Sequence, residues 1–355
     1  MAKYPILNKN LTKNYTVYDF QDNWDKDSIK EAIISSKGKL PSFCLSRIEI
    51  HPSGTCNQNC KTCYGKFLAP KKKLNLSAKY VNSLLSDIRK NLPNENPLIM
   101  LSGLYSEPLI NPEIKEILKY LGKYKFRFGL YTNGLLMNDE IIEILVKNSL
   151  NIEYGSSFVS FNIASSIFSG DFEKLIKIIK KLSAKKSNLQ INAPFLVLNP
   201  DYEYIKEIVE KLINAGVSVI KLSIPWPQFV YNKSEDTPLN KNNKKILETI
   251  EKIHKEFPNK IKVRYPHPKE SAHKCYVMAM AATISSEGKV YTCPETCSPF
   301  FKQLSYGDIK KNKFSKIWQG PKHQKVFKNF NLKNKKCKCC PVNAMFNEFC
   351  EKVSK

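Results

Sequence analysis

The sequence predicts an α/β protein in which parallel strands are joined through helices. Two observations lead to this prediction. Short apolar runs with strand character alternate with amphipathic helical patterns, and seven of the eleven cysteines fall between Cys275 and Cys350. A regular alternation of strands and helices is typical of a parallel sheet. The crowding of cysteines predicts a smaller C-terminal region with a different architecture.

The strand and helix patterns can be placed in order along the chain. Strands are expected at residues 47–50, 98–102, 127–131, 158–163, 190–198 and 217–224. The intervening helices show apolar residues at the i, i+3, i+4, i+7 spacing and are expected at 78–92, 112–120, 139–147, 171–182 and 202–215. Five such crossovers make a parallel succession, and its six strands are fewer than the eight of a closed barrel.

The remaining patterns divide the chain into domains. A further helix is expected at 242–257 and a further strand at 261–264, before the break at Pro266-His267-Pro268. We therefore expect an N-terminal extension (1–45), an α/β domain (46–266) and a C-terminal domain (267–355). In the last domain, residues 283–292 predict a β-hairpin that turns at Glu287-Gly288. That hairpin would bring Cys275 and Cys293 to the same end.

The composition is that of a soluble globular protein. Hydrophobic residues make up 42% and charged residues 25% of the 355 residues. No run approaches the roughly 20 apolar residues of a membrane span, and the N-terminus has no apolar signal segment, so a cytoplasmic location is expected. Eleven cysteines in a compartment that keeps thiols reduced indicate metal ligation rather than disulfides.

The formal net charge of +25 raises the question of a nucleic-acid partner. Only four of the 57 basic residues are arginines: Arg47, Arg89, Arg127 and Arg264. Proteins that read phosphates and bases favour the planar guanidinium, so a lysine-dominated chain argues against nucleic-acid binding. Dispersed, solvated lysine is the favoured interpretation, and attraction of an acidic substrate is the alternative.

Three cysteines, Cys56, Cys60 and Cys63, lie on one short loop directly after the first expected strand. Three thiolates can hold three irons of a 4Fe-4S cluster and leave the fourth iron open for a substrate or cofactor. A zinc site completed by a distant fourth ligand is the alternative. Zinc loops favour pairs of cysteines two residues apart, whereas here a lead cysteine stands four positions before the pair.

The spacing of this triplet resembles the signature of the radical S-adenosylmethionine (radical SAM) enzymes. The resemblance implies an open, partial (β/α)6 TIM-like barrel and a SAM-binding 4Fe-4S cluster with an open iron. Position 62, often aromatic in the family, is Thr62 here. In the family the residue at this position contacts the adenine of SAM through its backbone. Tyr64, two residues later, is a further candidate for contact with SAM.

Other candidate SAM contacts follow from the same resemblance. The run from Ser102 to Leu109 resembles the family's Gly-Gly-Glu-Pro segment, in which the acidic residue holds the methionine amino group, and Glu107 stands at that place. The sequence leaves a surface glutamate as the alternative for Glu107 and simple turn chemistry as the alternative for Asn133-Gly134. The predicted contacts are Tyr64, Ser102, Gly103, Glu107, Asn133, Ser160 and Asn162, the last two being expected to face the barrel interior from the fourth strand.

The C-terminal cysteines resemble the auxiliary-cluster extensions called SPASM and, in shortened form, Twitch. Position 346, a cysteine in the full pattern, is Phe346, and no cysteine follows Cys350, so one auxiliary 4Fe-4S cluster is expected. A structural zinc ion is the alternative. By Twitch analogy the ligands are Cys275, Cys293, Cys337 and Cys340, and by SPASM analogy Cys350 replaces one of the last two. Of the cysteines left over, Cys297 is a candidate catalytic residue that donates a hydrogen atom or touches substrate.

The resemblance implies a reaction. The enzyme would reductively cleave SAM to a 5'-deoxyadenosyl radical and remove a C–H hydrogen from a peptide or protein side chain, with net oxidation or cross-linking. A low-potential donor such as a flavodoxin or ferredoxin would supply the electron. Two alternatives stay open: a dehydrogenase or epimerase acting on an aminocyclitol, sugar or nucleoside, and a zinc-stabilised RNA-binding protein without redox chemistry.

Overall fold

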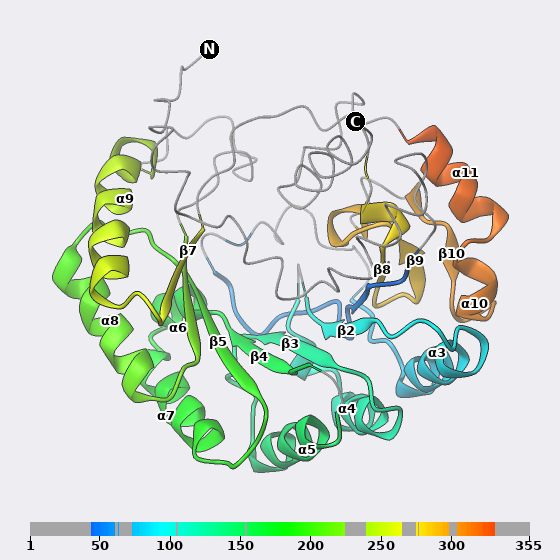
Figure 1. Ribbon diagram of the computed structural model, residues 1–355, viewed down its shortest axis with the longest axis horizontal. Helices are drawn as coiled ribbons and strands as arrows, with labels where there is room; N and C mark the ends of the chain where they lie inside the picture. The colour runs from blue at the N-terminus through cyan, green and yellow to red at the C-terminus, as the bar shows by residue number, and fades with distance from the viewer. Residues whose placement is uncertain are drawn as a thin grey trace.

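The computed structural model describes residues 44–60, 63, 73–103, 106–152, 155–223, 239–264, 275, 277–297 and 304–330. These residues form a ten-stranded sheet with the order β10-β9-β8-β1-β2-β3-β4-β5-β6-β7. The sheet is strongly curved, and the helices α3 to α9 follow one another around its outer side (Figure 1). The predicted partial barrel is confirmed.

The barrel consists of seven consecutive parallel strands and the helices between them. The strands are β1 (Arg47–Ile50), β2 (Leu98–Leu101), β3 (Phe128–Thr132), β4 (Phe158–Phe161), β5 (Gln190–Leu196), β6 (Val219–Ser223) and β7 (Ile261–Arg264). The helices are α3 (Ala78–Asn91), α4 (Ile114–Lys123), α5 (Asp139–Leu150), α6 (Ile163–Ser169), α7 (Phe172–Ser183), α8 (Tyr202–Asn214) and α9 (Leu239–Glu256).

The two faces of the sheet differ in character. On β1, Ile48 and Ile50 are fully buried in the large core that the strands share with the helices. Because side chains alternate along a strand, Arg47, Glu49 and His51 face the opposite side, which is the inside of the barrel. The first strand thus lines the barrel interior with charged and polar groups.

The fourth strand ends earlier than the sequence predicts. It stops at Phe161, and Asn162 begins the short helix α6, where its side-chain Oδ1 accepts a hydrogen bond from Ser165 N at 3.2 Å. Asn162 is exposed at this helix start. The prediction that Asn162 lies within the strand is therefore wrong, and its place at the barrel interior stays a prediction. Asparagine is a good helix cap, so local capping outweighs continuation of the strand.

The hairpin predicted in the C-terminal domain is present. Strands β8 (Ala281–Ile284) and β9 (Lys289–Tyr291) pair antiparallel, and Gly288 in the turn has φ 82°, a conformation that favours glycine. A short strand, β10 (Gly307–Asp308), pairs with β9. Strand β8 also pairs parallel with β1, with Glu49 opposite Thr283. The hairpin therefore extends the barrel sheet and stands directly beside the strand that leads to the cysteine triplet.

Two contacts hold the segment that follows β10 against the barrel. Helix α10 (Phe314–Ile317) lies beside α3, and α11 (Pro321–Asn329) follows it on the side of the hairpin (Figure 1). The buried carboxylate of Asp87 on α3 accepts hydrogen bonds from Ser315 N at 2.7 Å and Ser315 Oγ at 3.0 Å. The Asp87 carboxylate thus supplies an acceptor for the orphan N–H groups at the start of α10.

The second contact is a buried histidine. His323 is fully buried and stacks on Tyr306 with ring centroids 4.2 Å apart. Its Nδ1 accepts from Gln319 N at 3.1 Å, so Nε2 carries the proton and donates to the Met278 carbonyl at 2.8 Å. Burial lowers the pKa of His323 to about 4, although the bond to the Met278 carbonyl opposes the shift.

This histidine gives the fold a defined acid sensitivity. Because the folded pKa lies below the unfolded value of about 6.5, the stabilisation is fully present above pH 6.5 and is lost as the pH falls towards 4, by roughly 3 kcal/mol. Replacing His323 with Phe should lower the free energy of unfolding at pH 7 and flatten its decline below pH 6.5. Urea unfolding followed by tryptophan fluorescence measures both. Equal pH dependence in the two proteins would show that His323 is not the titrating group.

None of the described helices is both long and apolar enough to cross a membrane. The predicted N-terminal extension and the last 25 residues of the chain fall outside the described residues, apart from residues 44 and 45.

Candidate functional site

The cysteine triplet lies on a loop that begins at the carboxyl end of β1. The start of the loop is held to the segment before α3 by hydrogen bonds from Gly54 N to the Leu74 carbonyl (2.9 Å) and from Leu76 N to the Pro52 carbonyl (2.8 Å). Just before Cys56, the Thr55 carbonyl accepts a hydrogen bond from Glu107 N at 2.8 Å. The loop is therefore fixed to the barrel where the chemistry of α/β barrels is usually placed.

Further contacts tie the loop to the ends of the third and fourth strands. Asn57 Oδ1 accepts from Asn133 Nδ2 at 2.8 Å, directly after β3. Gln58 Nε2 donates to Ser169 Oγ at 3.0 Å on α6, which follows β4. These bonds come from segments far away in the sequence. They hold the loop over the mouth of the barrel, and no local motif in the sequence predicts them.

The thiols of this loop suit a positively charged group. Although the Cys56 side chain is exposed, the surrounding protein raises the pKa of its thiol, and the nearby charges of Glu107 and Cys63 raise that pKa further. Backbone N–H groups of Gln58 and Asn57 oppose the shift. A thiolate here needs a cation beside it, and cluster irons supply one.

Within the described ranges, no three His, Cys, Asp or Glu side chains gather around a point where one metal ion could sit. Each thiolate of an iron–sulfur cluster binds a different iron, so cluster ligands stand farther apart than the ligands of one ion. Three thiols on one loop with an open side fit a cluster with one unligated iron. They fit a closed four-ligand zinc site poorly.

Glu107 is 3% exposed and lies at the centre of this region. Its Oε1 accepts hydrogen bonds from Thr132 Oγ1 (2.6 Å) and Leu109 N (3.0 Å), and its Oε2 accepts from Asn133 N (2.8 Å). Burial raises the pKa of the Glu107 carboxyl, and these three hydrogen bonds offset part of the increase. The surface-glutamate interpretation is wrong. A carboxylate can accept about four hydrogen bonds, so one acceptor position stays available for an ammonium group.

Asn133 combines the two roles between which the sequence did not decide. Its Oδ1 accepts from Leu135 N at 3.0 Å, and Gly134 has φ 79°, so Asn133-Gly134 does form a turn. Its Nδ2 holds Asn57 of the cysteine loop. Asn133 thus affects the shape of the site indirectly, because it positions the cysteine loop.

Ser102, Gly103 and Ser160 also lie near the carboxyl ends of the strands. Ser102 and Ser160 are buried, and Ser160 pairs in register with Tyr131 and Asn192 on the neighbouring strands. At Gly103 a Cβ atom would come within 2.0 Å of the Ser106 carbonyl oxygen, so only glycine fits there without a shift of the backbone.

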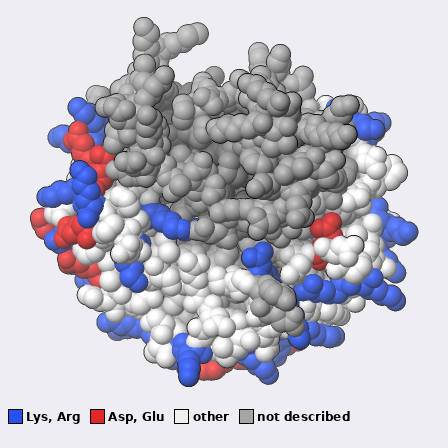
Figure 2. Space-filling view, in the orientation of Figure 1, with Lys and Arg blue, Asp and Glu red and all other residues white. Residues whose placement is uncertain are grey.

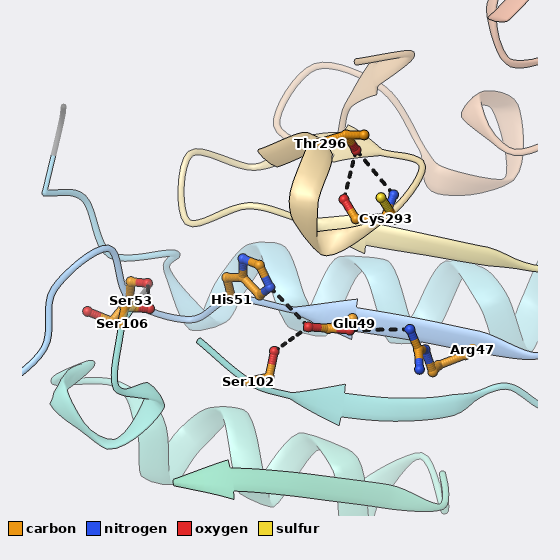
Figure 3. Close-up of polar contacts among 8 residues, drawn as sticks. All are labelled: Arg47, Glu49, His51, Ser53, Ser102, Ser106, Cys293 and Thr296. Carbon is orange, nitrogen blue, oxygen red and sulfur yellow. Dashed lines mark hydrogen bonds and ion pairs between the residues drawn. The ribbon is translucent and has the colours of Figure 1, made fainter. Parts of the chain in front are cut away.

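The structure adds a group that the sequence analysis missed. On the inner face of β1, Glu49 Oε1 accepts a hydrogen bond from Ser102 Oγ at 2.5 Å and lies 3.2 Å from His51 Nε2, while Oε2 pairs with Arg47 at 3.4 Å (Figure 3). The signal was present in the alternation of charged and apolar residues from position 47 to 51, which was used only to predict a strand.

Part of the auxiliary cysteine set can also be placed. Cys293 follows β9, where Thr296 Oγ1 donates to the Cys293 carbonyl at 2.7 Å (Figure 3). Cys275 precedes the hairpin, and Cys297 is 5% exposed. Tyr64, Cys337, Cys340 and Cys350 lie outside the described residues. The auxiliary ligand set therefore stays a prediction.

Charge on the molecular surface is dispersed. Figure 2 shows lysine and arginine side chains spread mainly along the rim of this face, with acidic side chains gathered at the left and a few at the right and the lower edge. Several lysines are paired with acids, as Lys211 is with Glu173 and Glu207. This pattern agrees with solvated lysine on the face that the figure shows.

Comparisons with known proteins agree with this geometry. The sequence model of the radical SAM superfamily matches residues 50–196, which include the cysteine loop, Glu107 and Asn133. The chain belongs to the radical SAM superfamily. The model of the SPASM iron–sulfur cluster-binding domain matches residues 275–341, a range that holds Cys275, Cys293, Cys337 and Cys340 and ends before Cys350. This radical SAM protein is thus an enzyme of a family that uses SAM and iron–sulfur clusters.

Similar proteins differ in what they act on. The chain is 20% identical to a tungsten-containing aldehyde ferredoxin oxidoreductase cofactor-modifying protein of Pyrococcus furiosus, over 76% of this chain and 79% of that one. It is 23% identical to the antilisterial bacteriocin subtilosin biosynthesis protein AlbA of Bacillus subtilis, over 77% of this chain but only 59% of AlbA. Among solved structures, Streptococcus suis SuiB bound to precursor peptide SuiA has a TM-score of 0.60 at 18% identity, covering 85% of this radical SAM chain and 70% of SuiB.

The position of Glu107 predicts a measurable effect on SAM affinity. If Glu107 holds the methionine amino group as the family resemblance implies, Glu107→Gln would remove a charge-assisted hydrogen bond of about 1.5–3 kcal/mol, and the affinity should fall by about one to two orders of magnitude. Isothermal titration with SAM under anaerobic conditions measures it. Glu116→Gln, on the exposed face of α4 and paired with Lys119, is the matched control and should bind like the wild type. Wild-type affinity in Glu107→Gln would rule out the contact.

Proposed function

We propose that this radical SAM enzyme oxidises a C–H bond in a peptide or protein side chain. The observation that carries the reaction class is the cysteine loop, which four segments of the barrel hold at its carboxyl-terminal mouth beside the buried Glu107. When bound, SAM and the cluster on this loop supply a carbon-centred radical that removes one hydrogen atom from an unactivated carbon.

The residues of the chain prepare that reaction in specific ways. Cys56, Cys60 and Cys63 would hold the cluster, and Glu107 would orient SAM through its amino group. Asn133 fixes the loop through Asn57. Met100, Phe158 and Tyr131 form a small apolar cluster on the inner face, which would keep water from a reactive carbon.

The C-terminal region would accept the second electron of a two-electron oxidation. Cys275 and Cys293, with two of the cysteines Cys337, Cys340 and Cys350, would hold one auxiliary 4Fe-4S cluster that accepts an electron. A flavodoxin- or ferredoxin-like donor in the cytoplasm would reduce the first cluster. The hairpin that carries Cys293 pairs with β1, which supports a position of the auxiliary site close to the barrel interior.

The peptide substrate rests on analogy. SuiB, which shares the fold, has been seen with a precursor peptide, and AlbA is named for bacteriocin biosynthesis. Another relative points to a small-molecule substrate instead: the protein of Pyrococcus furiosus, of which the chain spans 79%, is named for modifying a cofactor. A small cofactor or aminocyclitol is therefore the second candidate.

Turnover with labelled substrates decides between the two. The anaerobic enzyme is incubated with SAM, reductant and side-chain-deuterated peptides encoded next to its gene, and then with deuterated aminocyclitols. The proposal predicts deuterium in 5'-deoxyadenosine and a peptide lighter by two hydrogens. Turnover of the small molecules with the peptides left intact supports the second candidate. A peptide of unchanged mass that has gained one solvent hydrogen would indicate epimerisation and contradict net oxidation.

A further inference from the structure

The inner face of β1 carries a carboxylate and an imidazole in direct contact. Glu49 is 6% and His51 5% exposed, and His51 Nε2 lies 3.2 Å from Glu49 Oε1. Ser102 Oγ donates to the same oxygen, and Arg47 pairs with the other (Figure 3). A buried charge is costly unless it has partners, and here every partner of Glu49 is a donor.

The ionisation state of the Glu49 carboxyl determines which nitrogen of His51 carries the proton. Burial alone would raise the pKa of the Glu49 carboxyl, but the hydrogen bond from His51 and the charge of Arg47 hold the pKa below its ordinary value. An ionised carboxylate only accepts hydrogen bonds, so His51 Nε2 must be the donor. In a neutral imidazole the lone pair then lies on Nδ1, which makes Nδ1 a proton acceptor.

A small pocket adjoins the His51 side chain. His51 Nδ1 has no hydrogen-bond partner among the residues that the structure describes. Figure 3 shows the ring with this nitrogen turned away from Glu49. His51 lines a pocket of about 10 Å³, room for one water molecule, together with Ser53, Ser106, Ser285, Ser286 and Cys297. The pocket lies between the cysteine-triplet loop and the hairpin that leads to Cys293, the two regions that would hold the clusters.

We propose that His51, oriented by Glu49, accepts the proton that the substrate releases during oxidation. The inference rests on the proposed function. The substrate loses one hydrogen atom to the SAM-derived radical, one electron to an iron–sulfur cluster and one proton to His51 Nδ1, and is thereby oxidised by two electrons. The proton comes from the group that forms the new bond to the oxidised carbon. Glu49 is a positioning residue that sets the tautomer and stabilises the imidazolium formed.

The first test reads the tautomer without any substrate. A long-range proton–nitrogen correlation spectrum is recorded on the full-length protein labelled with 15N-histidine and holding its oxidised clusters; His51→Gln identifies the His51 signal among the five histidines. The proton is expected on Nε2, and Glu49→Gln should redistribute it between the two nitrogens. A proton on Nδ1 in the wild type would overturn the proposal.

The second test follows the yield of product per cleaved SAM on the peptide that the enzyme turns over. His51→Gln keeps a donor for Glu49 but cannot take up a proton, so 5'-deoxyadenosine should still form while oxidised product per 5'-deoxyadenosine falls about 100-fold or more. His254→Gln, on the outer helix α9, is the matched control. An unchanged ratio in His51→Gln would overturn the proposal. Failure of the wild type to oxidise any peptide would instead contradict the proposed function, while the tautomer test stands independently.

Discussion

Replacement of Cys56, Cys60 and Cys63 together by Ala is expected to abolish 5'-deoxyadenosine formation. We propose these three thiols as the ligands of the first cluster, and cleavage of SAM would need that cluster. Anaerobically reconstituted protein should lose about half of its iron, because one of two four-iron clusters is gone. Iron analysis and chromatography of the reaction products measure both quantities.

Cys44→Ala provides the control for this variant. Cys44 lies before β1 and belongs to neither predicted ligand set, so its replacement should leave iron content and SAM cleavage unchanged. Undiminished cleavage in the triple variant would exclude the loop as the cluster site.

Replacement of both Cys275 and Cys293 by Ala should leave SAM cleavage intact, unlike the triple variant. The auxiliary cluster should be lost, and product formation with it, while SAM is still cleaved without coupling to substrate. The physical reason is separation: Cys293 follows the hairpin β8–β9, whereas the triplet, Glu107 and Asn133 are held by β1 to β4. Iron content, product yield and 5'-deoxyadenosine are measured on one preparation.

Two results would contradict this assignment. Full iron content in the double variant would show that Cys275 and Cys293 are not cluster ligands. Zinc in freshly isolated wild-type protein, bound at the C-terminal site, would show that the site is structural.

The parts of the fold that local sequence determines were predicted well. The six βα units and the extra strand at 261–264 follow from periodicity, because each element buries one face against its neighbour. The hairpin 283–292 follows from its turn residues. The pairing of β8 with β1 joins segments more than 200 residues apart, and no local pattern encodes it.

The candidate site likewise has a part that local sequence predicts and a part that depends on long-range contacts. The spacing of Cys56, Cys60 and Cys63 is local and was readable directly. The hydrogen bonds that fix the loop join it to Asn133 and Ser169. Which side chains meet there depends on how the strand ends converge in the folded barrel. Asn162 was misplaced because its capping strength competes with the strand pattern on either side of it.

Electron paramagnetic resonance of the Cys275→Ala, Cys293→Ala variant tests the central claim most directly, since only the loop cluster would remain. The reduced protein is measured before and after the addition of SAM. The account predicts a signal of a reduced 4Fe-4S cluster whose g values shift on addition of SAM, because SAM binds the iron that Cys56, Cys60 and Cys63 leave open. A protein without that signal, or a signal that SAM leaves unchanged, would contradict it.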